Sequence, residues 1–145
     1  MAYKNLPDFV ARLEAAGELV RIREFVDPVL QITEVTDRIS KAPEHRNKAL
    51  LFENTGTGFP VLINSMGTER RMAMALGVNH LDDVSREIEG LFKQMATPKA
   101  SFMDKLRMLP TLGQVASWMP GRKSGRGACQ EVVMDVPDLS RLPIM

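Results

Sequence analysis

Several features are scarce in this 145-residue chain, and each scarcity excludes a class of protein. Cys129 is the only cysteine, so no disulfide can form within the chain, as is usual in a reducing cytoplasm. No apolar run approaches the ~20 residues that a membrane-spanning helix needs, and the N-terminus lacks the shape of a signal peptide. The net charge is +1, which gives no overall preference for nucleic acid. We therefore expect a cytoplasmic protein that neither inserts into a membrane nor binds nucleic acid.

Recognisable catalytic and metal-binding motifs are also missing. The chain has two histidines, and neither belongs to an HxxxH or HExxH pattern; no CxxC occurs either. His45 lies beside Glu44, and His80 lies close to Asp82 and Asp83. The two aspartates are explained by their place at the start of a predicted helix, where negative charge is favourable. We interpret both histidines as surface-loop residues, with a metal or catalytic role as the alternative.

Nucleophiles and phosphate-binding loops are equally sparse. Cys129 has no neighbouring histidine, and only Arg126 could lower the pKa of its thiol, so we interpret it as a structural cysteine. No GxSxG motif is present. The stretch NTGTGFPV precedes a predicted strand and lacks the Lys-Ser/Thr of a phosphate-binding loop, which favours a hairpin-like connection. The basic stretch GRKSGRG is interpreted as a solvated linker, with phosphate or nucleic-acid contact as the alternative.

Hydrophobic periodicity and capping residues predict alternating helices and strands. Asn5 and Thr68 are predicted helix caps, Gly17 and Gly77 are predicted helix ends, and Asp27 is predicted to cap a helix with Pro28 at its first position. Helices are predicted over residues 5–17, 28–42, 67–77 and 81–95, and strands over residues 18–25, 49–54, 59–65 and 129–134. The fold class is α/β, with a small mixed sheet and flanking helices.

The amino-acid composition of the chain changes after Thr97. Prolines, glycines and basic residues become frequent, and one or two short helices are predicted on a connecting arm. This arm is rich in apolar side chains, which pack either on their own domain or on another domain or subunit. The predicted domains are an N-terminal α/β domain (1–97), a helical and basic connecting arm (98–128), and the start of a further domain (129–145).

Three segments together resemble one protein family. They are DFVARLEAAGELVRI with VDPVLQITEVTDRI, ALLFENTGTGFPVLINSMGTERRMAMALGV, and CQEVVMDVPDLSRLPI. In this order and at these separations they resemble the N-terminal region of the UbiD family of decarboxylases, which includes 3-polyprenyl-4-hydroxybenzoate decarboxylase. The resemblance covers nearly the whole chain. Arg70, Arg71, Glu53 and Glu131 match positions typical of the family, but none matches its catalytic set.

The resemblance implies a reversible, non-oxidative decarboxylation of aromatic or α,β-unsaturated carboxylic acids, with a polyprenyl-hydroxybenzoate of ubiquinone or menaquinone biosynthesis as one candidate. It implies prenylated FMN as the electron sink and a divalent metal, Mn or Mg, and places both with the catalytic residues beyond residue 145. We therefore expect this chain to contain no catalytic, cofactor-binding or metal-binding residue of that carboxy-lyase and to be inactive alone. Residues 129–145 would form the start of an absent split β-barrel domain that binds the flavin, with residues 129–134 as its first strand.

Two functions remain open from the sequence. In the first, the chain is the non-catalytic N-terminal fragment of a UbiD-like lyase, whose partners are the remaining domains and, at full length, further copies of itself. In the second, it is a free-standing interaction module that binds a protein partner through the Met-rich arm.

Overall fold

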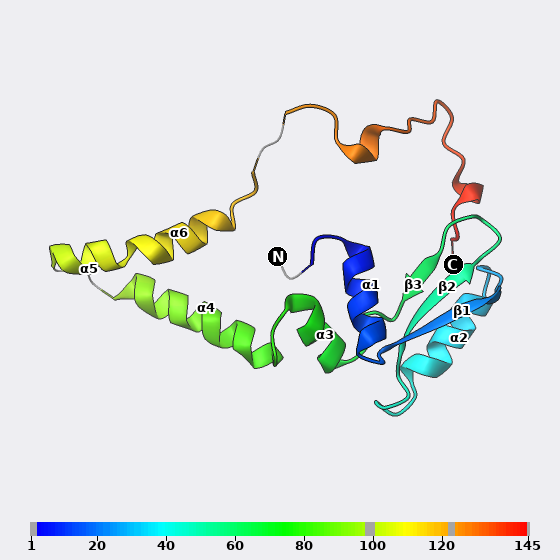
Figure 1. The fold of residues 1–145 in the computed structure, drawn as a ribbon, viewed down its shortest axis with the longest axis horizontal. Helices are drawn as coiled ribbons and strands as arrows, with labels where there is room; N and C mark the ends of the chain where they lie inside the picture. The colour runs from blue at the N-terminus through cyan, green and yellow to red at the C-terminus, as the bar shows by residue number, and fades with distance from the viewer. Residues whose placement is uncertain (1–2, 98–100, 122–123, 145) are drawn as a thin grey trace. The chain divides into compact units, whose positions relative to one another are not determined.

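The computed structural model describes residues 3–97, 101–121 and 124–144, and it confirms the predicted α/β class (Figure 1). Parts of the predicted arm and of the GRKSGRG stretch, residues 98–100 and 122–123, lie outside the described residues. In chain order the elements are α1 (Leu6–Ala15), β1 (Leu19–Phe25), α2 (Gln31–Ser40), β2 (Ala49–Asn54), β3 (Val61–Ile63), α3 (Glu69–Leu76), α4 (Leu81–Ala96), α5 (Phe102–Arg107), α6 (Leu109–Ser117), and two 3-10 turns at Ala128–Gln130 and Leu139–Arg141.

Among the described residues, three strands form a mixed sheet in the order β1-β2-β3. Strands β1 and β2 are parallel, with Ile22 opposite Phe52, and the crossover between them contains α2. Strand β3 then returns antiparallel to β2, with Val61 opposite Phe52. A parallel pair needs a long crossover whereas an antiparallel pair needs only a short turn, which matches the two connection lengths here.

Helices cover both faces of the sheet, because side chains alternate between faces along each strand. On one face, Ile32 of α2 packs with Leu50 and Phe52 of β2. On the other face, Phe9 and Leu13 of α1 pack against Ala49, and partly buried side chains of α3 join them. The mixed sheet therefore lies between α2 on one side and α1 with α3 on the other (Figure 1).

Local capping signals place two helices correctly. The Asn5 side chain accepts the Asp8 N–H at 2.9 Å at the start of α1, and the Thr68 hydroxyl accepts the Arg71 N–H at 3.3 Å at the start of α3. Gly77 ends α3 with φ of 72°, a left-handed conformation that glycine adopts without a Cβ clash. These predicted starts and ends are confirmed.

The predicted start of α2 is wrong by one turn. Asp27 does not cap the helix; its carboxylate accepts the Val29 N–H at 2.8 Å and closes a short turn that contains Pro28. The residue before α2 is Leu30, whose φ of 69° is incompatible with a continuous helix from Pro28. An aspartate that bonds its own backbone two residues on competes with helix capping, and here the turn prevails.

The chain forms two compact units, one of residues 1–83 with 136–145 and one of residues 84–135. In the second unit, α4 and α6 are antiparallel neighbours. Thr111 donates its hydroxyl to Gln94 at 3.0 Å, and Gln114 donates its amide to Glu87 at 2.9 Å. The predicted division of the chain at residues 97 and 128 stays a prediction.

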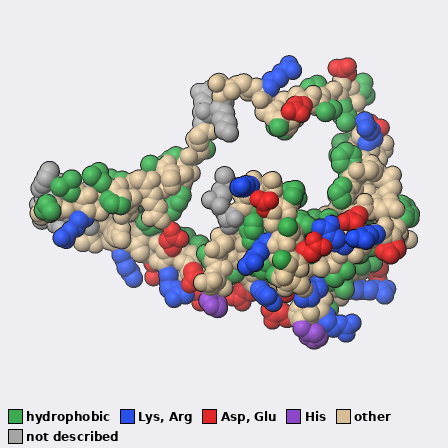
Figure 2. All heavy atoms as spheres, viewed as in Figure 1, with side chains coloured by type: hydrophobic (Ala, Val, Ile, Leu, Met, Phe, Trp, Pro, Cys, Tyr) green, Lys and Arg blue, Asp and Glu red, His purple; other side chains and the backbone are tan. Residues whose placement is uncertain are grey.

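Helix α4 spans Leu81–Ala96, close to the predicted residues 81–95, and within the described residues it is not a core helix. None of its residues is buried: Ile88 is 47% exposed and Phe92 is 68% exposed. Apolar side chains are visible at the surface along this helical unit in Figure 2. Truncation of Ile88 to alanine is thus expected to cost a monomer far less than the about 2–5 kcal/mol typical of a buried position.

Residues 129–134 do not form the expected strand. Ala128–Gln130 make a 3-10 turn, and residues 131–134 lie outside helices and strands. A strand is held by hydrogen bonds to a neighbouring strand, and the described pairings involve only β1, β2 and β3. The assignment of residues 129–145 to a further barrel domain stays a prediction.

Candidate functional site

A buried polar cluster links three segments of the first unit. Arg71 extends from the first turn of α3. Glu18 immediately precedes β1, and Asn47 lies two residues before the start of β2. Arg71 is fully buried, and Glu18 and Asn47 are 5% and 7% exposed. We call these three residues the Arg71 cluster.

Hydrogen bonds hold the Arg71 guanidinium in one orientation. Its NH1 donates to Glu18 Oε2 at 3.1 Å and to the Asn47 carbonyl oxygen at 2.6 Å, and its NH2 donates to Asn47 Oδ1 at 2.8 Å. Within the described part of the chain its Nε has no partner. A buried charge persists only when paired and hydrogen-bonded, so the cluster fixes α3 against the segments that precede β1 and β2.

Glu18 is shared by three cations. Its Oε1 accepts from Lys48 Nζ at 3.2 Å and from Arg70 NH1 at 3.1 Å, while its Oε2 accepts from Arg71. The Lys48 side chain is 24% exposed and that of Arg70 is 61% exposed, so these two contacts extend from the buried cluster to the surface.

The turn before α3 leaves space for the Arg71 side chain. Asn64 adopts a φ of 55° and donates its amide to Asn47 Oδ1 at 2.8 Å and to the Lys48 carbonyl oxygen at 2.9 Å. A Cβ on Gly67 would overlap Asn64 Oδ1 and lie 2.9 Å from Arg71 NH2. Only glycine fits there, which gives the Gly-Thr-x-x-Arg pattern a structural reason.

A polar cavity of about 440 Å³ opens beside the cluster. It is lined by Glu18, Glu44, His45, Lys48, Thr68 and Arg70. A smaller hollow of about 300 Å³ shares Glu44 and Arg70 with it and also includes His80. The structure therefore brings His45 and His80 to two hollows that share Arg70, a proximity the sequence did not reveal.

These hollows do not form a metal site. No group of three His, Cys, Asp or Glu side chains suited to a metal ion occurs among the described residues. His45 and His80 are exposed, which agrees with their interpretation as surface-loop residues. The Asp83 carboxylate accepts the His80 N–H at 3.0 Å at the start of α4, so the predicted helix-terminal role of this aspartate is confirmed.

The other residues singled out in the sequence do not belong to the Arg71 cluster. Cys129 is exposed in the 3-10 turn, and Arg126 and Glu131 are also exposed. Glu53 of β2 accepts from Arg21 of β1 at 2.6 Å and belongs to a separate surface ion-pair network.

That network joins α1 to the sheet. Arg21 donates two hydrogen bonds to the Glu14 carboxylate, at 2.7 and 2.9 Å, and one to Glu53. The hydrogen bonds from Arg21 hold the pKa of Glu14 below its ordinary value, and the two carboxylates raise the pKa of Arg21. The group is solvent-exposed, so we assign it a role in orientation rather than in catalysis.

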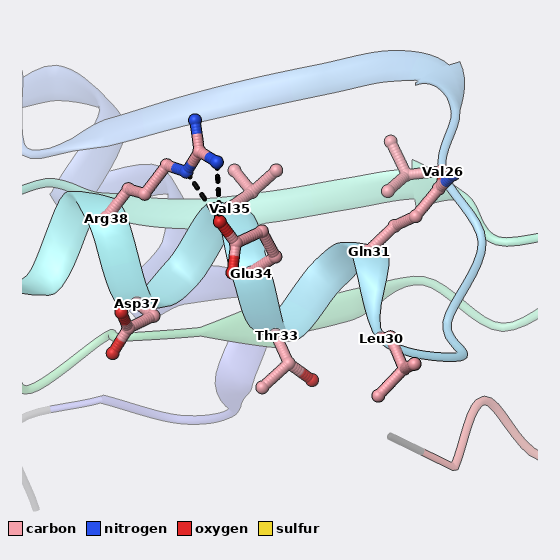
Figure 3. Close-up of a pocket in the computed structure, with 8 residues that line it drawn as sticks. All are labelled: Val26, Leu30, Gln31, Thr33, Glu34, Val35, Asp37 and Arg38. Atoms are coloured by element: carbon pink, nitrogen blue, oxygen red, sulfur yellow. Dashed lines mark hydrogen bonds and ion pairs between the residues drawn. The ribbon is translucent and has the colours of Figure 1, made fainter.

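A third cavity, of about 940 Å³, lies along α2 (Figure 3). Apolar side chains of Val26, Leu30 and Val35 line it, and Glu34 and Arg38 form an ion pair at its rim at 2.6 Å. The remaining lining residues are Gln31, Thr33 and Asp37. The rim charges are internally paired, so this groove lacks a group placed for acid–base chemistry.

Sequence reasoning matched Arg71 only as a family-typical position and missed its partners. The available signal was weak: Glu18 and Asn47 are polar residues directly before or near a strand, and nothing local marks them as buried.

In the part of the chain that the structure describes, every helix is too short or too polar to span a bilayer.

Comparison with known proteins places the chain in a family. The model of the 3-octaprenyl-4-hydroxybenzoate carboxy-lyase N-terminal domain matches residues 10–89, more than half of the chain. An uncharacterized protein of Archaeoglobus fulgidus is 41% identical over 146 aligned residues, and one of Aquifex aeolicus is 43% identical over 145. These alignments include 100% and 99% of this chain. They include only 28% of the A. fulgidus protein and 29% of the A. aeolicus protein, so the chain spans less than a third of the length of either relative. The chain therefore belongs to the family of UbiD carboxy-lyase N-terminal domains.

Proposed function

We propose that this chain acts as the non-catalytic N-terminal domain of a larger cytoplasmic UbiD-type carboxy-lyase. The family match over residues 10–89 carries the proposal, and it coincides with the α/β unit and the Arg71 cluster. The relatives matched along the entire chain are more than three times longer, which supports a role as one part of a larger protein.

The reaction that this larger protein would catalyse is a reversible, non-oxidative decarboxylation. The proposed substrates are aromatic or α,β-unsaturated carboxylic acids, with a polyprenyl-hydroxybenzoate of quinone biosynthesis as a specific candidate. The carboxy-lyase in the description of the matched family supports the reaction class.

The described residues support placing the cofactors of that reaction in other domains. A Mn²⁺ or Mg²⁺ ion requires several oxygen ligands, and the described residues hold no group of three that could supply them. The buried guanidinium of Arg71 is already bonded to Glu18 and Asn47, so it is not available to a flavin phosphate. We therefore propose that other domains bind prenylated FMN and the metal, and we assign no reaction step to this chain.

The proposed contribution of this domain is orientation. The Arg71 cluster and the two apolar faces of the sheet hold α1, α2 and α3 in fixed positions. A rigid α/β unit of this kind is suited to support the wall of a cleft built by neighbouring domains.

The first experiment is the intact mass of the gene product in its native cell, measured after immunocapture. A species several times heavier than 16.2 kDa is expected. In parallel, the 145-residue chain is incubated with prenylated FMN, a divalent metal and aromatic acids. Tight flavin binding with release of CO₂ by this chain alone would overturn the proposal that other domains bind the cofactors and carry out the reaction.

A free-standing interaction module is the second candidate, and the exposed side chains of the arm favour it. Met103, Trp118 and Met119 are each more than half exposed. A pull-down with and without residues 99–128 tests it, because loss of a partner on deletion would support an interaction role. Binding to nucleic acid by the basic stretch would instead weaken steeply with salt.

A further inference from the structure

The larger polar hollow beside the Arg71 cluster has the properties of a small-molecule site. Its volume of about 440 Å³ lies within the range of such sites. Glu18 is buried in its wall, and the partly exposed side chains of Lys48 and Arg70 extend from that carboxylate to the surface. The two cations come from separate segments, since Lys48 immediately precedes β2 and Arg70 belongs to α3.

The Glu18 carboxylate holds these two cations close to each other. Lys48 Nζ lies 3.2 Å and Arg70 NH1 lies 3.1 Å from the same oxygen atom, Glu18 Oε1. Two like charges at so short a separation repel, and the shared carboxylate offsets that repulsion. Both cations are therefore positioned before a ligand arrives, which lowers the entropic cost of binding one.

Hydrogen-bond donors remain in the hollow after this pairing. An ammonium has three N–H groups and a guanidinium has five, and within the described chain Glu18 is the side-chain partner of both Lys48 and Arg70. The Thr68 hydroxyl accepts the Arg71 N–H at 3.3 Å and keeps its own O–H for donation. Glu18 already accepts three hydrogen bonds, so the groups left for a ligand are mainly donors.

The charge balance of the hollow also favours an anion. Three cations, Lys48, Arg70 and the buried Arg71, outnumber the carboxylates of Glu18 and Glu44. Glu44 is exposed, so solvent and salt screen its charge more strongly than the charges of the buried groups. Among its described lining residues, the smaller adjoining hollow has two glutamates and no lysine, which assigns the anion to the larger one.

We propose that the larger hollow binds a phosphoryl group, either free or on a small metabolite, with Lys48 and Arg70 as its cationic donors. A phosphoryl group presents oxygen atoms in several directions and suits donors that converge from different segments, whereas a planar carboxylate suits the fork of one arginine. The Thr68 hydroxyl and the His45 imidazole line the same hollow and are further donors. The proposal uses no part of the carboxy-lyase reaction, so it stands independently of the proposed function.

The test is an NMR titration of the isotope-labelled 145-residue chain at constant ionic strength. The probes are inorganic phosphate, glycerol phosphate and acetate. Saturable shifts of the amide signals of residues 44–48 and 68–70 are expected with both phosphoryl compounds, and weaker binding is expected with acetate. Tighter binding of glycerol phosphate than of inorganic phosphate would assign a phosphorylated metabolite, and equal binding would assign the free anion; either result supports phosphoryl recognition.

Four variants locate the site. Lys48→Met and Arg70→Met are each expected to raise the dissociation constant for phosphate about fivefold or more, because each removes a charge-assisted donor. Arg38→Met is the matched control and should change it less than about twofold, since Arg38 is another exposed helical arginine that is paired with a glutamate. Glu44→Gln should tighten binding, because it removes a carboxylate that repels the anion.

Amide spectra of the ligand-free variants establish that each keeps its fold. The opposite sign expected for Glu44→Gln separates recognition of the anion from a general loss of structure. The absence of saturable shifts with both phosphoryl compounds would overturn the proposal. So would acetate binding as tight as phosphate binding, or equal weakening by Arg38→Met and Arg70→Met, which would indicate only non-specific attraction between charges.

Discussion

The substitution Arg71→Met removes the guanidinium from the buried cluster while keeping an unbranched side chain in its place. Arg71 is fully buried and makes three hydrogen bonds, one to Glu18 and two to Asn47. Breaking a buried charge pair by removal of one partner typically costs about 3–5 kcal/mol of folding free energy. Glu18 would retain Lys48 and Arg70, which limits the loss, whereas the Asn47 carbonyl would lose the donor at 2.6 Å. We expect a loss of about 3 kcal/mol.

The neighbouring Arg70→Met is the matched control. Arg70 lies on the same helix and bonds the same glutamate, but its side chain is 61% exposed. An exposed ion pair contributes about 0–1 kcal/mol, so the two adjacent arginines should differ several-fold in their effect.

Equilibrium urea unfolding, followed by far-UV circular dichroism at neutral pH, measures both losses. Trp118 is the only tryptophan and lies in the second unit, so its fluorescence separately reports unfolding there. Equal stability losses for Arg71→Met and Arg70→Met would refute the assignment of Arg71 as the buried anchor. Arg71→Lys should fall between wild type and Arg71→Met, because lysine cannot form the forked pair of hydrogen bonds.

Three further predictions concern stability. Gly67→Ala should cost about 1–3 kcal/mol in urea unfolding because its Cβ overlaps a neighbouring amide oxygen, whereas Gly90→Ala, with open space around it on α4, should be neutral or slightly stabilising. Glu14→Gln should remove part of the acid sensitivity of stability. The lowered pKa of Glu14 means that its contribution is present above its ordinary value of 4.5 and is lost as the pH falls through the lowered folded-state pKa. The melting temperature, measured from pH 7 to pH 3, should therefore fall less steeply with acid in the variant than in the wild type. Identical profiles would contradict the stabilising role of the hydrogen bonds from Arg21 to Glu14. Ile32→Ala, at a fully buried position, should cost about 2–5 kcal/mol, and a smaller loss in chemical denaturation would show that the core beneath α2 is misassigned.

Elements with strong local signals were predictable from the sequence. Asn5 and Thr68 cap their helices, and Gly77 ends α3, because these interactions involve residues only a few positions apart. The alternation of apolar residues also identified β1 and β2. The start of α2 was not predictable, since Asp27 is equally able to cap a helix and to close a turn.

The candidate site was predictable only in part. The family resemblance singled out Arg70 and Arg71 but gave them no partners, and neither Glu18 nor Asn47 carries a local mark of burial. The sequence separations between Arg71 and these partners are 53 and 24 residues, so the contacts exist only once α3 packs onto the sheet.

The sequence by itself therefore determined the α/β class, the helix boundaries with short-range caps, and the family to which the chain belongs. Only the tertiary structure decided that Arg71 is a buried anchor and that, among the described residues, the apolar side chains of α4 stay exposed. The physical reason is the range of the forces. Capping and periodicity act within one or two helical turns, whereas burial depends on which distant segments pack together.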